Sequence, residues 1–216
     1  WGRGPWGPIF GTSGHPAPVA VNDLGDFTID FDVSFSGQNG GDLMIDVYTL
    51  PDTAFDGDAV NEVSIFLSHN GVGPIEWLTT SATATHTFSG AMGDCAIYKQ
   101  PTSIQVMVMP RTGGARREVL SGPLDLKEIL QYLVSIGQVD GTALVAGLEF
   151  GVEPQRPNAY NSAPYSGSAK WLTQPVVTFA AANVGVNLFE TPVNFTISAL
   201  WNPNGVTTTP NRFTED

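Results

Sequence analysis

Two segments of this sequence have the alternating pattern of a β-strand, and each carries a glutamate on its polar side. One is residues 61–67, Asn-Glu-Val-Ser-Ile-Phe-Leu, and the other is residues 147–154, Gly-Leu-Glu-Phe-Gly-Val-Glu-Pro. Because side chains of a strand alternate between its faces, Glu62 and Glu153 fall opposite the apolar side chains. Two facing carboxylates are what glycoside hydrolysis requires, one as acid/base and one as nucleophile or base. Either glutamate alone is also compatible with an ordinary exposed residue of an amphipathic strand.

The composition favours one domain made of many short strands. The chain has 216 residues, of which 42% are apolar and only 14% charged, with 24 Gly and 16 Pro. All-β domains commonly reach this length, and frequent Gly and Pro suit many turns. We therefore expect a single domain over residues 1–216, with an irregular N-terminal segment at 1–18 and a C-terminal tail at 202–216.

Charge and the rare residue types exclude several classes of function. The formal net charge of -12 argues against nucleic acid and anionic membranes as partners, whereas a neutral polysaccharide is compatible with it. No apolar run is long enough to span a membrane. Cys95 is the only cysteine, which we expect to be a buried or incidental thiol, and the three histidines lack the spacing of metal ligands. We expect neither a metal nor a cofactor.

Hydrophobic periodicity predicts the elements that position the two glutamates. Residues at helical spacing, with Pro123 before them and Gly137 after them, predict one helix over 125–136. The other apolar segments alternate with period two and predict strands at 26–35, 43–48, 61–67, 76–80, 82–88, 95–99, 103–110, 142–152, 171–179, 184–189 and 193–200. Many short strands with one helix favour an all-β fold, a two-sheet antiparallel β-sandwich whose concave face could hold a linear polymer.

Several motifs, taken in order, resemble glycoside hydrolase family 12, the β-jelly-roll endoglucanases and xyloglucanases. Residues 61–67 are similar to a family strand of the type [Tyr/Asn]-Glu-Leu-Met-Ile-Trp-Leu, and Gly-Pro-Ile at 73–75 follows as in the family. Residues 150–154, Phe-Gly-Val-Glu-Pro, are similar to the acid/base motif Phe-Gly-Thr-Glu-Pro. Ile45-Asp46-Val47 occupies the place of an upstream strand with a Tyr-Asp pair, and the predicted helix lies where the family has one. The resemblance covers roughly residues 25–180.

The resemblance implies an endo-acting, retaining hydrolase of β-1,4-glucan-type polysaccharides such as cellulose, xyloglucan or mixed-linkage glucan. It implies Glu62 as nucleophile and Glu153 as acid/base, with their carboxyl groups about 5–5.5 Å apart. It also implies that Asp46 hydrogen-bonds Glu62, although a solvated strand aspartate is an equally good interpretation. Glu149 is expected to line the cleft wall rather than to act in catalysis.

Other residues depart from the family pattern or are candidates for binding sugar rings. Ser64 and Phe66 replace Met and Trp of the nucleophile strand and are expected to alter substrate contacts beside Glu62. Aromatic side chains stack on sugars but also dominate cores, and the candidates are Phe66, Trp77, Tyr98, Tyr160, Tyr165 and Trp171. The family's N-terminal strands have no clear match before residue 20. Since residues 194–201 faintly resemble one of them, a permuted strand order is conceivable.

Two further interpretations complete the expectations. Arg111, Arg116 and Arg117 cluster in a Gly-containing loop, which is either a solvated loop or a contact for an acidic substituent of an unusual polysaccharide. The alternative to an enzyme is a non-catalytic carbohydrate-binding or structural β-sandwich, because fold does not fix function. We expect a monomer, and a secreted, extracellular protein, since a chain that starts at Trp1 would fit removal of a signal peptide.

Overall fold

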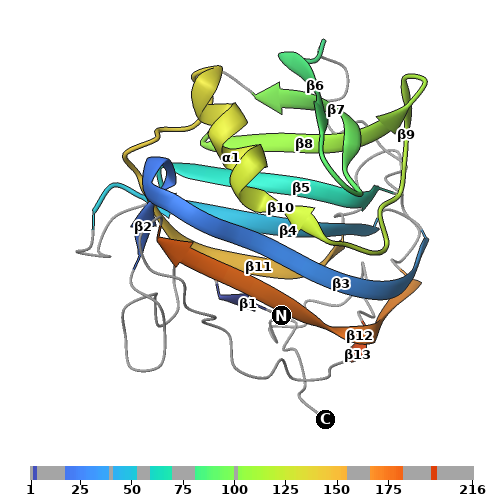
Figure 1. Cartoon of the computed structure of the whole chain (residues 1–216). Helices are drawn as coiled ribbons and strands as arrows, with labels where there is room; N and C mark the ends of the chain where they lie inside the picture. The colour runs from blue at the N-terminus through green and yellow to red at the C-terminus, as the bar shows by residue number, and fades with distance from the viewer. Residues whose placement is uncertain are drawn as a thin grey trace.

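A computed structural model of the chain describes most of the central part of the sequence. The described residues are 2–3, 18–38, 41–52, 59–69, 81–99, 102–154, 166–181 and 196–198. They form two β-sheets that face each other, with one α-helix, α1, beside the smaller sheet (Figure 1). The all-β sandwich expected from the sequence is thereby confirmed.

The larger sheet contains nine of the described strands and carries both glutamate segments. Its main path runs in the order β1 (Gly2–Arg3), β11 (Leu144–Pro154), β4 (Gly41–Leu50), β5 (Asn61–His69), β8 (Gln105–Thr112), β7 (Gly93–Lys99) and β6 (Ala84–Phe88). Two short strands lie off this path: β2 (Val19–Ala20) pairs with β11, and β9 (Ala115–Arg116) pairs with β8.

The smaller sheet has four described strands, in the order β10 (Leu124–Asp125), β3 (Leu24–Gln38), β12 (Ser166–Ala181) and β13 (Thr196–Ser198). A short 3-10 helix, η1 (Val21–Asp23), leads into β3. The long β3 and β12 pair along most of their length and cross one face of the nine-stranded sheet (Figure 1).

The apolar core fills the space between the sheets, where both sheets contribute buried apolar side chains. Phe31 of β3 meets Phe150 of β11 edge to face, with ring centroids 4.9 Å apart, and Phe27 meets Phe179 in the same way at 5.0 Å. Such edge-to-face pairs stabilise a core beyond the area they bury. Cys95 is buried, as expected, and burial raises the pKa of its thiol to about 12.

Helix α1 (Leu126–Ser135) begins and ends close to the sequence signals. The side chain of Asp125 accepts a hydrogen bond from the backbone N–H of Glu128 at 2.9 Å, which caps the first turn. Gly137 follows the last turn with φ +70°, a conformation that only glycine adopts without strain. The side chains that α1 buries against the core are Leu126, Ile129, Leu130 and Leu133. No helix in the described part of the chain is long and apolar enough to cross a membrane.

Two details differ from the sequence expectations. The sandwich is not wholly antiparallel, because β5 and β8 pair in parallel, with Glu62 opposite Gln105. The long connection from residue 69 to residue 105 makes this crossover possible. Gly2–Arg3, expected to be irregular, adds a short strand beside β11 because the edge of that strand offers unpaired backbone groups.

The C-terminal expectations are met only in part. Thr196–Ser198 is a strand, β13, and it pairs with β12 at the edge of the smaller sheet. The strands expected at 76–80 and 184–189 and the tail at 202–216 lie outside the described residues.

Candidate functional site

The face of the nine-stranded sheet that is turned away from the four-stranded sheet, called here the outer face, carries the candidate site. On β5, Val63, Ile65 and Leu67 belong to the core between the sheets. Side chains alternate along a strand, so Glu62 lies on the outer face. The concave cleft that the sequence predicts would lie on this face.

Three carboxylates meet on this face around one tyrosine. In the register of the sheet, Tyr48 of β4 is opposite Glu62, and Asp46 lies between Ser64 on β5 and Glu149 on β11. The Tyr48 hydroxyl donates to Glu149 Oε2 at 3.4 Å, the long end of the hydrogen-bond range.

Two neutral side chains hold the Glu62 carboxylate. Glu62 Oε1 accepts hydrogen bonds from Ser64 Oγ at 3.4 Å and from Gln105 Nε2 at 3.1 Å. Gln105 Nε2 also donates to Ser64 Oγ at 2.8 Å, which links the two donors. The parallel pairing of β5 with β8 brings Gln105 opposite Glu62. The carboxylate is therefore restrained from two neighbouring positions.

Opposing effects act on the ionisation of Glu62. Burial, the largest effect, raises the pKa of this carboxyl above its ordinary value, and the negative charge of Glu149 raises it further. The hydrogen bonds from Ser64 and Gln105 lower the pKa, because they stabilise the ionised form. The net direction is upward, so these two donors limit the cost of ionising a buried carboxyl.

Tyr48 remains a hydrogen-bond donor over the whole working range of pH. Burial is the largest cause that raises the pKa of its phenol, followed by the charges of Asp46, Glu149 and Glu62. A phenol surrounded by carboxylates resists losing its proton, because a further negative charge would be repelled. Tyr48 thus lies within the electric field of all three carboxylates.

The register does not bring Glu153 to this group. Glu153 is opposite Asp42, whereas Glu149 is opposite Asp46 and Glu62 is opposite Tyr48. With about 3.3 Å per residue and about 4.8 Å per strand spacing, the Cα positions of Glu62 and Glu149 are about 12 Å apart, against about 22 Å for Glu62 and Glu153. In this register Glu149 lies nearer to Glu62 than Glu153 does, and the close pair of Glu62 with Glu153 stays a prediction. Glu149, expected only to line the cleft, is the second glutamate of the group.

The predicted sugar contacts on β5 and β7 are packed into the sheet face. Ser64 is fully buried and bonded to Glu62 and Gln105, so it positions the carboxylate. The side chains of Phe66 and Tyr98 are buried, with only 5% and 4% of their surface exposed to solvent. They belong to a second apolar cluster on the outer face, separate from the core, made of Met44, Phe66, Ala96, Tyr98, Met107 and Met109.

The other aromatic candidates divide into two cases. Trp171 belongs to β12, where it is opposite Val33, so its backbone lies in the four-stranded sheet and not in the sheet that carries Glu62. Its expected role in binding sugar rings stays a prediction. Trp77, Tyr160 and Tyr165 lie outside the described residues.

Polar residues gather at the far end of the same face, where β4 begins and β5 ends. His69 Nδ1 and Asp42 Oδ1 are 2.5 Å apart, and both side chains are almost completely buried. The guanidinium of Arg111 lies over the ring of Tyr98, 5.6 Å from its centroid, and donates to the Tyr98 hydroxyl. Arg116 is opposite Arg111 in the β8–β9 hairpin.

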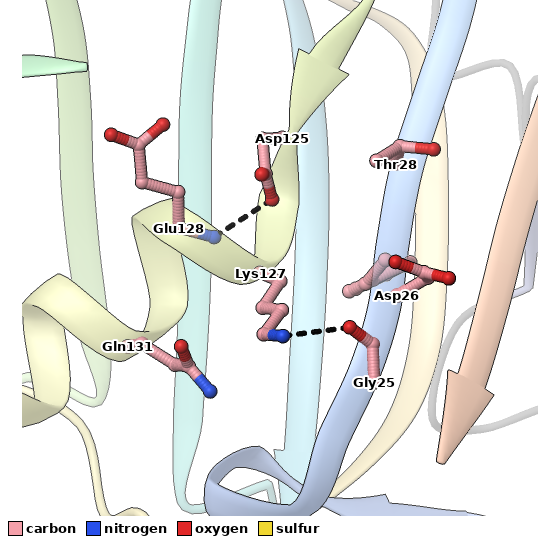
Figure 2. A pocket seen from close by; sticks show the side chains of 8 residues that line it. Gly25, Asp26, Thr28, Asp125, Lys127, Glu128 and Gln131 are labelled. Carbon is pink, nitrogen blue, oxygen red and sulfur yellow. Dashed lines mark hydrogen bonds between the residues drawn. The ribbon is translucent and has the colours of Figure 1, made fainter. Parts of the chain in front are cut away.

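A separate pocket lies on the other side of the nine-stranded sheet, between α1 and β3 (Figure 2). Its cavity is about 220 Å³, and Lys127 donates to the backbone oxygen of Gly25 beside it at 2.7 Å. It is separated from the carboxylate group by the nine-stranded sheet. The described ranges contain no group of three or more His, Cys, Asp or Glu side chains that could hold a metal ion.

Comparison with solved structures identifies the fold. The chain is similar to a family 12 xyloglucanase from Bacillus licheniformis, with 16% identity and a TM-score of 0.57 over 76% of this chain and 66% of that chain. It is also similar to endoglucanase 3 from family 12 of Trichoderma harzianum, with 19% identity and a TM-score of 0.54 over 76% and 66%. An endoglucanase from Rhodothermus marinus matches with 21% identity and a TM-score of 0.52 over 76% and 73%.

These likenesses show that the chain has the β-sandwich fold of family 12 glycoside hydrolases. No protein-family model and no curated protein matches the sequence. At identities of this size the solved structures establish the fold alone, and the argument for function depends on the side chains of the outer face.

Sequence reasoning missed three members of the site. Glu149 and Glu153 occupy positions of the same parity on their strand, and the resemblance implied the acid/base role for Glu153 and left Glu149 on the cleft wall. Tyr48 carried a signal, since it follows Asp46 by two residues and so shares its face. No sequence signal pointed to Gln105, because its place beside Glu62 depends on a parallel pairing between distant segments.

Proposed function

We propose that this protein is an endo-acting, retaining glycoside hydrolase that cleaves polysaccharides of the β-1,4-glucan type. The observation that carries the proposal is the group formed by Glu62 and Glu149 around Tyr48. Two glutamates on the same face interact electrostatically, and each accepts a hydrogen bond from a fixed side chain. A retaining glycosidase requires such a pair of neighbouring carboxyl groups.

In the proposed mechanism the two glutamates have different roles. The Glu62 carboxylate attacks the anomeric carbon while Glu149 gives its proton to the departing glycosidic oxygen, so that the C–O bond breaks and a glycosyl ester of Glu62 forms. Glu149, now ionised, takes a proton from a water molecule, whose oxygen attacks the same carbon and releases Glu62. Both displacements invert the carbon, and the product retains the β configuration.

The assignment of Glu62 as nucleophile is supported by its partners. A nucleophile must be ionised to attack, and the hydrogen bonds from Ser64 and Gln105 favour the ionised form. They also fix the direction of the carboxylate, which reduces the entropy lost on reaching the transition state. Asp46, opposite both Ser64 and Glu149, is proposed to orient this group.

The proposed substrate class follows from the fold and the charge. The solved structures of the same fold include a xyloglucanase and endoglucanases. A chain with a net charge of -12 is compatible with an uncharged polymer backbone. We propose a secreted monomer that acts without a metal or cofactor.

The test is hydrolysis of soluble β-1,4-glucans by the protein and its Glu62→Gln variant. Release of reducing ends from hydroxyethyl cellulose, xyloglucan and mixed-linkage glucan is measured together with the anomer formed first, by NMR. We expect β-anomer release by the parent chain. The variant should lose on the order of a thousandfold or more in rate, because covalent catalysis is removed.

The outcomes separate the alternatives. Early release of the α anomer would refute the double displacement, and near-parental activity of Glu62→Gln would refute the nucleophile. Binding of glucans without any cleavage by the parent chain would identify a carbohydrate-binding sandwich instead of an enzyme. Thermal unfolding of the variant is the control, because loss of the fold would also abolish activity.

A further inference from the structure

The outer face carries a basic pair at the end opposite the carboxylate group. Arg111 and Arg116 are directly opposite each other in the β8–β9 hairpin. Like charges at such positions repel each other and destabilise a hairpin. The pair occurs in a chain with only 9 Lys and Arg against 21 Asp and Glu. Two cations held together in so acidic a protein need an explanation.

Arg116 differs from every other cation whose side chain the structure describes. Lys99, Arg111, Arg117 and Lys127 each donate a hydrogen bond to a backbone carbonyl. Arg116 makes no hydrogen bond or ion pair with any described residue, although Asp42, Arg111 and Tyr98 are near enough to act on its charge. Its five N–H donors are therefore available for a ligand.

Arg111 is fixed in contrast to Arg116. Its Nη1 donates to the backbone oxygen of Gly114 at 2.9 Å, and its Nη2 donates to the hydroxyl of Tyr98. The Nε of Arg111 is buried and has no hydrogen-bond partner among the described residues. Asp42 is fully buried and in contact with His69, and its negative charge partly offsets the repulsion between the two guanidinium groups.

The basic pair and the carboxylate group belong to one continuous row of side chains. Along β8, Gln105, Met107, Met109 and Arg111 alternate onto the outer face, and Gln105 donates to Glu62 at the other end. About 20 Å separates the backbone positions of Gln105 and Arg111 at about 3.3 Å per residue. Because Met107 and Met109 are almost completely buried, only a glycan of several sugar residues that passes over them can reach from Glu62 to Arg116.

We propose that Arg116, assisted by the field of Arg111, binds a carboxylate on the glycan, so that the preferred substrate is a β-glucan that carries acidic substituents such as uronic acid branches. A guanidinium matches a carboxylate because its fork donates two parallel hydrogen bonds. The inference rests on the proposed function, since it assumes that a glycan occupies the outer face. It gives the basic pair a role that the neutral backbone of the polymer does not require.

The experiment compares two soluble polymers with the same backbone, the anionic carboxymethyl cellulose and the neutral hydroxyethyl cellulose. Dissociation constants are measured by affinity electrophoresis and calorimetry in the Glu62→Gln background, so that the polymers are not consumed. Arg116→Gln is the test variant. Lys127→Gln is the matched control, because it removes the same charge on the other side of the nine-stranded sheet (Figure 2).

We expect tighter binding of carboxymethyl cellulose than of hydroxyethyl cellulose despite the net charge of -12. Arg116→Gln should weaken binding of carboxymethyl cellulose about tenfold relative to hydroxyethyl cellulose, the size of one charge-assisted hydrogen-bonded pair. The difference should shrink in high salt, where a partly exposed pair is screened. Lys127→Gln should leave the ratio of the two affinities unchanged.

Three results would overturn the inference: no preference for the anionic polymer, equal loss on both polymers in Arg116→Gln, or the same loss in Lys127→Gln. The proposed function can fail separately. If neither polymer is hydrolysed by the parent chain but binding of carboxymethyl cellulose still depends on Arg116, the acidic-glycan site stands and the hydrolase does not. If both are hydrolysed without dependence on Arg116, the reverse holds.

Discussion

The choice between Glu149 and Glu153 as partner of Glu62 can be tested by one matched pair of substitutions. Glu149→Gln and Glu153→Gln make the same chemical change on the same face of β11, four residues apart. Four residues of a strand span about 13 Å. Glu149 interacts electrostatically with Glu62 and accepts a hydrogen bond from Tyr48.

The expected losses of kcat in the two variants differ by orders of magnitude. Loss of a general acid and base costs about a hundredfold to ten thousandfold in rate, which corresponds to about 3–5 kcal/mol of barrier. We expect a fall of this size in kcat on hydroxyethyl cellulose for Glu149→Gln. With its Cα position about 22 Å from that of Glu62 in the register, Glu153 is expected to lie too far from the bond under attack to act on it. We expect Glu153→Gln to change kcat by no more than a few fold.

Leaving-group dependence and azide rescue identify the role itself. An aryl cellobioside with a good leaving group needs little protonation, so Glu149→Ala should form the glycosyl ester at a rate near that of the parent chain. Azide needs no general base, and its addition should yield a β-glycosyl azide with Glu149→Ala. Glu153→Ala should form no azide product. The reasoning is refuted if Glu153→Gln abolishes hydrolysis while Glu149→Gln keeps most of it in a folded protein.

Two further predictions concern the ionisation of Glu62. Gln105→Leu removes a donor that lowers the pKa of Glu62, so this pKa should rise further and the acidic limb of the kcat/KM profile should move to higher pH; an unmoved limb would contradict the role of the donor. Glu62→Gln should affect stability in a pH-dependent way. Since the folded pKa of Glu62 lies above its unfolded value, the parent chain loses stability as pH rises from the unfolded pKa through the folded pKa, whereas the glutamine does not titrate. The variant should therefore gain in Tm relative to the parent between acidic and neutral pH, and a difference in Tm that does not vary with pH would show that burial does not disfavour the carboxylate.

Local patterns in the sequence determined much of the fold. The alternation around Glu62 and around Phe150 correctly separates core side chains from those of the outer face, since the faces of a strand depend only on the parity of residue positions. The helix is likewise predicted by local residues: the Asp125 cap, the spacing of its apolar side chains and Gly137 after its last turn. Each of these signals depends on neighbours within a few positions along the chain.

The tertiary structure alone decided which side chains meet. Glu149 and Glu153 are four residues apart, so they lie on the same face of their strand. Shifting β11 along β4 by an even number of residues would leave every side chain on the same face of the sheet. Only the register, with Glu149 opposite Asp46, selects one of them as the neighbour of Glu62. Alternation contains no information about that register, because it is set by packing over the whole sheet.

The same reasoning applies to the partners of the proposed nucleophile and to the basic pair. Gln105 reaches Glu62 because β5 and β8 pair in parallel across 43 residues of sequence, and no local pattern encodes such a contact. The sequence placed Arg111, Arg116 and Arg117 together, but the fold turned Arg117 to backbone carbonyls and left Arg116 without a described partner on the side of Glu62. Residue types and faces were determined by the sequence, whereas distances and pairings were decided by the non-local contacts that assemble the sheets.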